Sequence, residues 1–398
     1  MDASAEASSL LAQTIRPSAQ AVRWGALQQR LAAAHAAGEI ELLAELGGGP
    51  AESLQTNDSA TRERARQGLE RVLTCLALLP KLGAVQAVLE LAARPGVLAS
   101  PPRGHADGVA RRLGAMLGSV QDEATLVAVL AQRERQPLPH TLDVLACWLH
   151  EKLLRGGQLE ALVPVRRFSL ELQKVAHPLG ALPLHLLALE QMAPRLAASY
   201  GLSHAASWTV PLKPLSELAP RWPAGALVPP VGDVGTPEEL GRIGAVWQSA
   251  CQVSNGKSEA RVFLFERPLA GLPLAAELLC SLDLACLRGV APASVQVQSL
   301  EPHEAYGVLL GMAANGGEYN TAWSGAFGRL AAWQSLSGLC GVEPSTNLPS
   351  IEHQACRCRW AFFHAPSHWF DRVVSDFAIA AVRPDEESLA LLAATDSD

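Results

Sequence analysis

Hydrophobic positions in the first half of the chain recur with the period of an amphipathic helix. In residues 141–155 they fall at i, i+3, i+4, i+7 and i+11, which places them on one helix face. The same pattern predicts helices over residues 17–37, 62–79, 82–93, 107–117, 122–132, 141–155, 158–173 and 179–200. Short Gly/Pro breaks separate these segments, so residues 1–202 are predicted to form an all-α, solenoid-like stack of helical hairpins. The irregular spacing of the hairpins matches no strict repeat.

Local signals mark two of the predicted helix boundaries. Gly38 follows the first helix where a C′ residue is expected, and Asn57 or Asp58 precedes the next one as a candidate N-cap.

The pattern changes between residues 203 and 235, where prolines are concentrated. This composition cannot be helical throughout, although residues 206–212 read as partly extended. We expect residues 203–235 to be a joint between two separately folded domains.

Beyond the joint, residues 236–398 combine helical and strand patterns. Thr236 is a predicted N-cap for a helix that continues to about residue 252. Further helices are predicted over 274–287, 302–315 and 322–340, and extended segments over 260–266, 294–299, 351–364, 372–382 and 388–394. The expected fold class is α+β, an N-terminal all-α hairpin stack followed by a mixed α/β-sheet domain.

A glycine pair interrupts the two helices around residue 315 and introduces a short polar loop. Adjacent glycines accept positive φ, so their backbone amides could point at a ligand, although a helix C-cap followed by a tight turn gives the same pattern. The predicted binding loop comprises Asn315, Gly316, Gly317, Glu318, Tyr319 and Asn320.

Asp376 stands within a predicted apolar strand, on the same face as Val374, Ala378 and Ala380. A carboxylate that points into a core must be paired or hydrogen-bonded, and Arg329 is the candidate partner. The alternatives are a purely structural ion pair, a solvated aspartate at a strand end, or a cleft that Arg329 and Asp376 share with Glu318 and Tyr319. We include Arg329 and Asp376 among the predicted binding residues.

The cluster around His353, Cys356 and Cys358 is the only metal-like pattern in the sequence. On a strand, Cys356 and Cys358 would share a face with Trp360 and Phe362, as core residues do, and no second ligand pair is apparent. We therefore expect two buried thiols and no metal.

Two further motifs are incomplete, so no cofactor is expected. The Gly256-Lys257-Ser258 triplet lacks the leading glycine of a phosphate-binding loop and lies between a helix and a strand, the wrong order. The segment 322–326 lacks the outer glycines of a hydrolase nucleophile elbow.

Composition limits the possible partners. With 49% hydrophobic and 18% charged residues, the chain is expected to form sizeable cores, and a net charge of -7 disfavours nucleic-acid binding. No secretion signal or membrane-spanning run is apparent, so we expect a cytoplasmic protein. The eight cysteines are too sparse for a disulfide framework.

The region from about residue 256 to the terminus resembles an uncharacterised bacterial family, found mainly in GC-rich actinobacteria and myxobacteria and known only as a domain of unknown function. The matching segments are 315–317 with Tyr319, 325–333, Trp360, 369–370, Asp376 and 392–398. The resemblance implies a family but no activity.

Two hypotheses for the function follow. The first is a non-enzymatic protein that binds a protein partner or a ligand, with an immunity or regulatory role as one form of it. The alternative is an enzyme of unrecognised type with a cleft around residues 315–320. The oligomeric state is left open.

Overall fold

The computed structural model describes residues 21–98, 105–138, 140–193, 222–248, 256–315, 324–370 and 376–396. Contacts within the chain divide it into two compact units, Met1–His185 and Leu186–Asp398. The α+β class predicted from the sequence is confirmed, because helices form the first unit and a six-stranded sheet lies in the second. No helix in the described ranges is both long enough and apolar enough to span a membrane.

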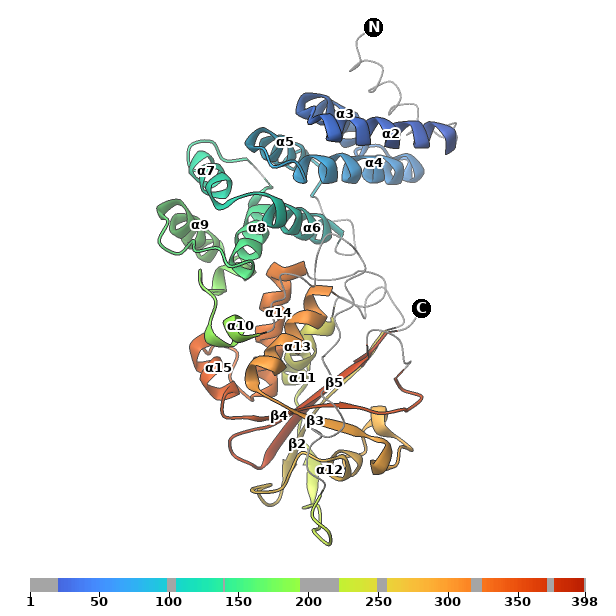
Figure 1. Ribbon diagram of the computed structural model, residues 1–398, viewed down its shortest axis with the longest axis vertical. Helices are drawn as coiled ribbons and strands as arrows, with labels where there is room; N and C mark the ends of the chain where they lie inside the picture. The colour runs from blue at the N-terminus through green and yellow to red at the C-terminus, as the bar shows by residue number, and fades with distance from the viewer. Residues whose placement is uncertain are drawn as a thin grey trace. The chain divides into compact units, whose positions relative to one another are not determined.

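The described part of the first unit is built from helices alone (Figure 1). They are α2 (Ala21–Ala37), α3 (Ile40–Ser53), α4 (Ser59–Ala77), α5 (Leu82–Ala92), α6 (His105–Val120), α7 (Glu123–Arg133), α8 (Leu142–Leu154), α9 (Val163–Lys174) and the 3-10 turn η1 (Pro178–Ala181). Both predicted boundary signals hold. Gly38 has a φ of 68° after α2, and the Asp58 carboxylate caps α4 by accepting a 2.9 Å hydrogen bond from the Thr61 amide.

Helix α3 was missed because its sequence contains Gly47-Gly48-Gly49-Pro50, which predicts a break. Tertiary packing overrides that local preference. Leu43 and Leu46 are fully buried, and a Cβ at Gly47 would lie only 2.7 Å from the Leu91 side chain. The missing side chain lets α3 approach α5 closely, and the burial compensates for the weak helix propensity.

Helices α6 to α9 do not pack simply as consecutive hairpins, since α6 contacts α8 and α7 contacts α9. Two glycines one turn apart explain the first contact. A Cβ at Gly114 would lie 2.3 Å from the Cys147 Cβ, and one at Gly118 would lie 2.5 Å from the Glu151 Cβ. The backbone of α6 therefore lies directly against α8.

The helix predicted over residues 179–200 is wrong as far as the described residues extend. The chain instead forms η1 and then the short helix α10 (Ala188–Met192), with Pro183 in the segment between them. A proline there lacks the backbone donor that a continuous helix needs. Helix α10 contacts α13 and belongs to the second unit.

The sheet of the second unit has the strand order β1-β2-β6-β5-β4-β3. Every pairing is antiparallel. The domain therefore combines helices with strands, but its sheet is not a mixed one. The strands are β1 (Val231–Asp233), β2 (Lys257–Phe265), β3 (Gln296–Leu300), β4 (Arg359–His364), β5 (Phe377–Val382) and β6 (Ser388–Thr395). All residues of β5 and β6 are buried, which explains why both read as continuous apolar runs.

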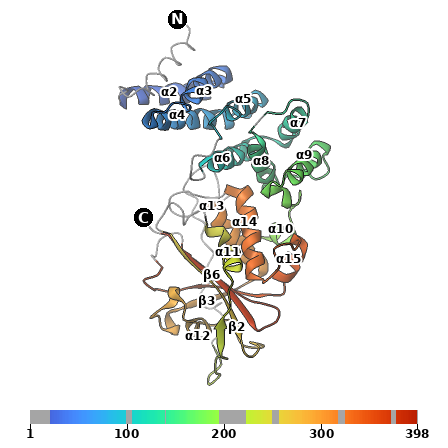
Figure 2. The same cartoon turned by 180° about the vertical axis from the view of Figure 1, so that it is seen from behind.

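Helices cover both faces of this sheet (Figures 1 and 2). On one face, α12 (Ala276–Cys280) and the turn η6 (Ala285–Leu287) pack against residues such as Phe363 and Leu391. On the other lie α11 (Pro237–Ile243), the turn η4 (Gly244–Trp247), α13 (Pro302–Asn315) and α14 (Ser324–Leu339). Trp247 of η4 packs on Phe377 of β5 with ring centroids 5.7 Å apart. The turn η7 (Pro292–Ser294) precedes β3.

The strand predicted over residues 351–364 is only half correct. Its first part is α15 (Leu348–Ala355), whose N-cap Asn347 accepts a 3.0 Å hydrogen bond from the Ser350 amide. The strand begins at Arg359. The helix start was recognisable from an asparagine two residues before a proline.

The predicted joint, residues 203–235, lies outside the described residues as far as residue 221, as does the extended segment predicted over 206–212. The last part of the joint contains β1, which pairs with β2 at the edge of the sheet. Contacts place the division between His185 and Leu186. Separate folding of residues 1–202 stays a prediction.

Candidate functional site

The predicted binding loop follows α13, which ends at Asn315. Gly316, Gly317, Glu318, Tyr319 and Asn320 lie outside the described residues. The role of the loop in binding therefore stays a prediction. The two supporting residues, Arg329 and Asp376, are described.

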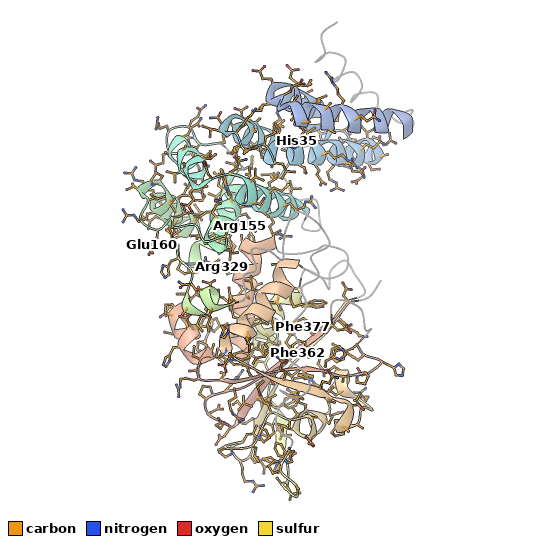
Figure 3. The ribbon with its side chains drawn as sticks, in the orientation of Figure 1. His35, Arg155, Glu160, Arg329, Phe362 and Phe377 are labelled. Carbon is orange, nitrogen blue, oxygen red and sulfur yellow. The ribbon has the colours of Figure 1, made fainter. Side chains whose placement is uncertain are left out.

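Arg329 projects from α14 and is fully buried (Figure 3). Its ion pair is with Glu190 of α10, and not with Asp376 as the sequence analysis proposed. The contact has two prongs. The Nε atom donates to Glu190 Oε1 at 2.6 Å, and an Nη atom donates to Oε2 at 2.9 Å. A two-pronged contact between guanidinium and carboxylate is the strongest geometry for such a pair.

Glu190 accepts three further hydrogen bonds. The Tyr306 hydroxyl of α13 and the Trp333 indole of α14 donate to Oε1 at 2.9 and 3.0 Å. The Leu187 amide donates to Oε2 at 2.8 Å. With the two bonds from Arg329, five donors surround one carboxylate. This network ties α10 to the hairpin of α13 and α14.

The same donors control the protonation of Glu190. Burial alone would raise its pKa, but the charge of Arg329 and the hydrogen bonds from Arg329, Leu187 and Trp333 outweigh burial and hold the pKa below its ordinary value. The glutamate is therefore ionised at neutral pH. Both carboxylate oxygens of Glu190 are occupied by donors from α13, α14 and the start of α10, so the pair holds three helices together.

Sequence reasoning missed Glu190 because it assigned the residue to the middle of one long helix. The signal was nevertheless present. Glu190 is the third residue of α10 and reaches back to the Leu187 amide, as a glutamate in a capping box does. The backbone amide of Leu189, in the first turn of α10, donates to the carboxylate of Glu352 in α15 at 2.7 Å.

Asp376 lies immediately before β5 and is only partly buried. Its carboxylate accepts a hydrogen bond from the hydroxyl of Thr395. The register explains this contact, because Phe377 pairs with Ala394 and the residues before and after them lie opposite each other. Asp376 is therefore at the start of the strand, not inside it, and its carboxylate links the ends of β5 and β6.

The prediction of two buried thiols is wrong for Cys356. It ends α15 and is exposed, whereas Cys358 is buried and lies before β4. The strand alternation that was assumed does not apply, because residues 348–355 are helical. Among the described residues, no group of three or more His, Cys, Asp or Glu side chains could hold a metal ion.

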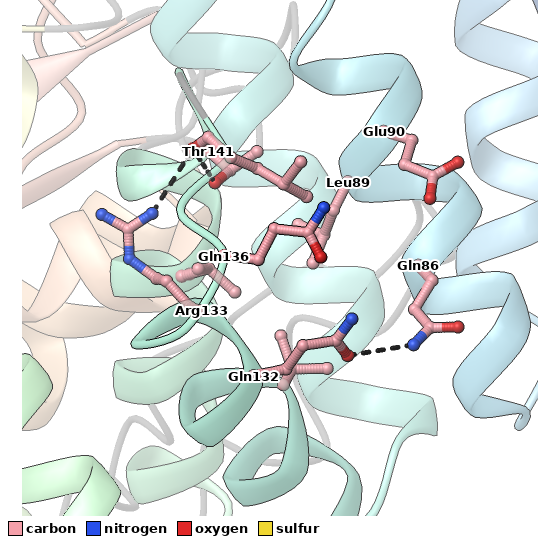
Figure 4. A pocket seen from close by; sticks show the side chains of 10 residues that line it. Gln86, Leu89, Glu90, Gln132, Arg133, Gln136 and Thr141 are labelled. Atoms are coloured by element: carbon pink, nitrogen blue, oxygen red, sulfur yellow. Dashed lines mark hydrogen bonds between the residues drawn. The ribbon is translucent and has the colours of Figure 1, made fainter.

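A pocket of about 510 Å³, counting the open space at its mouth, lies within the first unit (Figure 4). Leu89, Val129 and Leu145 line it and are almost fully buried. The other lining residues are Gln86 and Glu90 of α5, Gln132 and Arg133 of α7, and Gln136, Leu138 and Thr141 of the following segment. The room left in it for groups the size of a water molecule is about 70 Å³, below the about 300–1,000 Å³ of typical small-ligand sites, so the pocket is a small one.

The polar groups of this pocket are only partly engaged. The side-chain amide of Gln86 donates to the side-chain oxygen of Gln132 at 3.0 Å (Figure 4). Arg133 is committed, since it donates to Glu171 at 2.6 Å and to the Leu138 carbonyl at 3.4 Å. Within the described part of the chain, no hydrogen bond or ion pair involves the side chain of Glu90 or Gln136. These two groups face solvent and are available to a ligand.

The pocket was missed although each half has a local signature. Residues 86, 89 and 90 fall at i, i+3 and i+4 of one helix, and 129, 132, 133 and 136 continue the same spacing on another. Each stripe reads as a normal solvated face. Only the packing of the first unit brings the two stripes together.

Comparisons with known proteins give a family but no activity. The model described as "Family of unknown function (DUF6183)" matches residues 25–398. The match covers nearly the whole chain, not only the C-terminal third in which the resemblance was noticed. Neither the curated proteins nor the solved structures contain a match.

Proposed function

Because the chain belongs to DUF6183, a family of unknown function, no relative supplies an activity, and we propose from its own geometry that it is a non-enzymatic binding protein. The observation that carries the proposal is the pocket between α5 and α7, which combines an apolar floor with uncommitted amide and carboxylate groups at its wall. This combination of a largely apolar lining and a few convergent polar groups is typical of binding sites.

The proposed partner is another protein. Glutamine side chains both donate and accept hydrogen bonds, so Gln86, Gln132 and Gln136 can pair with the backbone or side chains of a polypeptide segment. The pocket is open to solvent and lies on the surface of a helical stack, an architecture that presents extended binding surfaces. An immunity or regulatory protein, which acts by occupying another protein, is one form of this function.

The alternative of an enzyme with a cleft around residues 315–320 receives less support. Arg329, one of its proposed members, is wholly buried and bound to Glu190 in a two-pronged contact. A guanidinium held in this way is poorly suited to contact a substrate. The binding role predicted for the loop residues themselves stays a separate prediction.

The test blocks the pocket and leaves its surroundings intact. Gln136→Trp places a large ring at the pocket, and Arg135→Trp adds the same ring at the neighbouring exposed residue, which does not line the pocket. Both variants and the unmodified protein are used to capture partners from native lysate, followed by mass spectrometry.

We expect one protein to be captured by the unmodified chain and by Arg135→Trp, but not by Gln136→Trp. Equal capture by all three proteins would place the binding surface elsewhere. If all three proteins convert a metabolite of the lysate at the same rate, the result favours the alternative of an enzyme with a cleft around residues 315–320.

A further inference from the structure

We propose that the pocket between α5 and α7 receives an arginine side chain of the partner polypeptide. The inference rests on the proposed binding function and names the chemistry that the pocket recognises. Three features of the lining residues support it: a carboxylate without a partner, amide oxygens in suitable places, and an apolar floor.

The charge of the pocket favours a cation. Glu90 is an exposed carboxylate for which the described residues provide no ion pair. The one cation in the lining, Arg133, is neutralised by Glu171 at 2.6 Å. Both terminal nitrogens of Arg133 are engaged, with Glu171 and with the Leu138 carbonyl, and its Nε, which has no partner in the described part of the chain, is buried out of reach of a ligand. An anionic ligand would therefore find no uncommitted cation in the lining, whereas a cationic ligand would find Glu90.

The spacing of the acceptors favours arginine over lysine. Gln86 and Glu90 are one turn apart on α5, and Gln132 and Gln136 are one turn apart on α7 and the segment after it. Gln132 Oε1 already accepts from the Gln86 amide, so the acceptors left for a ligand are the Glu90 carboxylate and the side-chain oxygens of Gln86 and Gln136. A guanidinium has five donors in a flat fork, which suits several separated acceptors, whereas an ammonium is a compact charge with three.

The floor suits the rest of the side chain. Leu89, Val129 and Leu145 provide a buried apolar surface. The methylene stem of an arginine can lie against such a surface while its charged end reaches polar groups. Each of the three side chains is at most 4% exposed, so the floor is a small surface that the stem of one side chain can cover.

The experiment uses the full chain and three small probes, Nα-acetyl-arginine methylamide, its uncharged citrulline analogue and Nα-acetyl-glutamate methylamide. Binding is measured by ligand-observed NMR up to about 50 mM probe, since a single side chain is expected to bind with a Kd on the order of 1 mM. The variant is Glu90→Gln. The matched control is Glu45→Gln, which removes another exposed carboxylate from the same unit but outside the pocket.

We expect the arginine probe to bind the unmodified protein and Glu45→Gln equally, and Glu90→Gln about tenfold more weakly. Gln136→Trp should abolish binding. If the citrulline or glutamate probe binds as well as arginine and is blocked by Gln136→Trp, the preference for arginine is wrong while the pocket remains a binding site. If no probe binds at the highest concentration, or if Gln136→Trp has no effect, the pocket itself is not a site for side chains.

Discussion

Two glutamates, one in each unit, lie in opposite surroundings. Glu190 of the α/β unit is buried and accepts hydrogen bonds from five donors. Glu90 of the helical unit is exposed and has no bonded partner among the described residues. Since a saturated carboxylate serves the fold and an unsaturated one remains available, these two glutamates should respond very differently to substitution.

The largest effect is expected from breaking the buried pair. Arg329→Met should leave Glu190 as an uncompensated buried charge, and the free energy of unfolding should fall by about 3–5 kcal/mol. Urea denaturation of the full chain at neutral pH measures this loss. A loss below about 1 kcal/mol would contradict the structural role of the pair.

The double variant Glu190→Gln/Arg329→Met is the control for this measurement. It removes both charges, so it should be more stable than Arg329→Met alone. Glu90→Gln in the helical unit changes the same kind of side chain but should alter stability by no more than about 0.5 kcal/mol.

The next effect concerns the glycine contact of the helical unit. Gly114→Ala would place a Cβ 2.3 Å from the Cys147 Cβ of α8, and we expect a loss of about 1–3 kcal/mol from the displaced helix. Gly49→Ala in α3 is the matched control, because nothing lies within 4 Å of its added Cβ. That substitution should be neutral or stabilising, by up to about 1 kcal/mol, through helix propensity. Equal losses in both variants would show that α6 and α8 are not in close contact.

A smaller effect is the dependence on pH of the contribution that Glu190 makes to stability. The pKa of Glu190 is lowered in the folded state from an ordinary value of 4.5. Its contribution to stability is therefore complete above that value and is lost as the pH falls through the lower folded pKa. The stability difference between the unmodified protein and Glu190→Gln should shrink below about pH 4.5. Urea titrations at several pH values measure this, and a difference independent of pH would refute it.

The smallest effect on stability is expected in the pocket. Gln132→Ala removes an exposed amide and its bond to Gln86, and Gln136→Ala removes an amide without a bonded partner in the described residues. Each should change the free energy of unfolding by no more than about 0.5 kcal/mol, while partner capture weakens. Thermal melting and the capture assay together test this. A large stability loss with normal capture would assign these glutamines to the fold.

The sequence by itself determined features that depend on neighbouring residues. Helix boundaries at Gly38 and Asp58, the helix 302–315 and the apolar strand 388–395 were all predictable to within a few residues. Their causes are local, namely a glycine at positive φ, a carboxylate three residues before an amide, and a period of apolar side chains. The α+β class followed from these elements.

Only the tertiary structure decided which distant residues meet. Helix α3 forms across a glycine-rich segment because α5 packs against it. Arg329 was predicted to form an ion pair with Asp376, yet its partner is Glu190, 139 residues away in the sequence. The pocket likewise joins faces of α5 and α7 that each read as solvated surface. A residue pattern limits which side of an element is buried, but burial leaves several partners possible, and only the packed chain selects one.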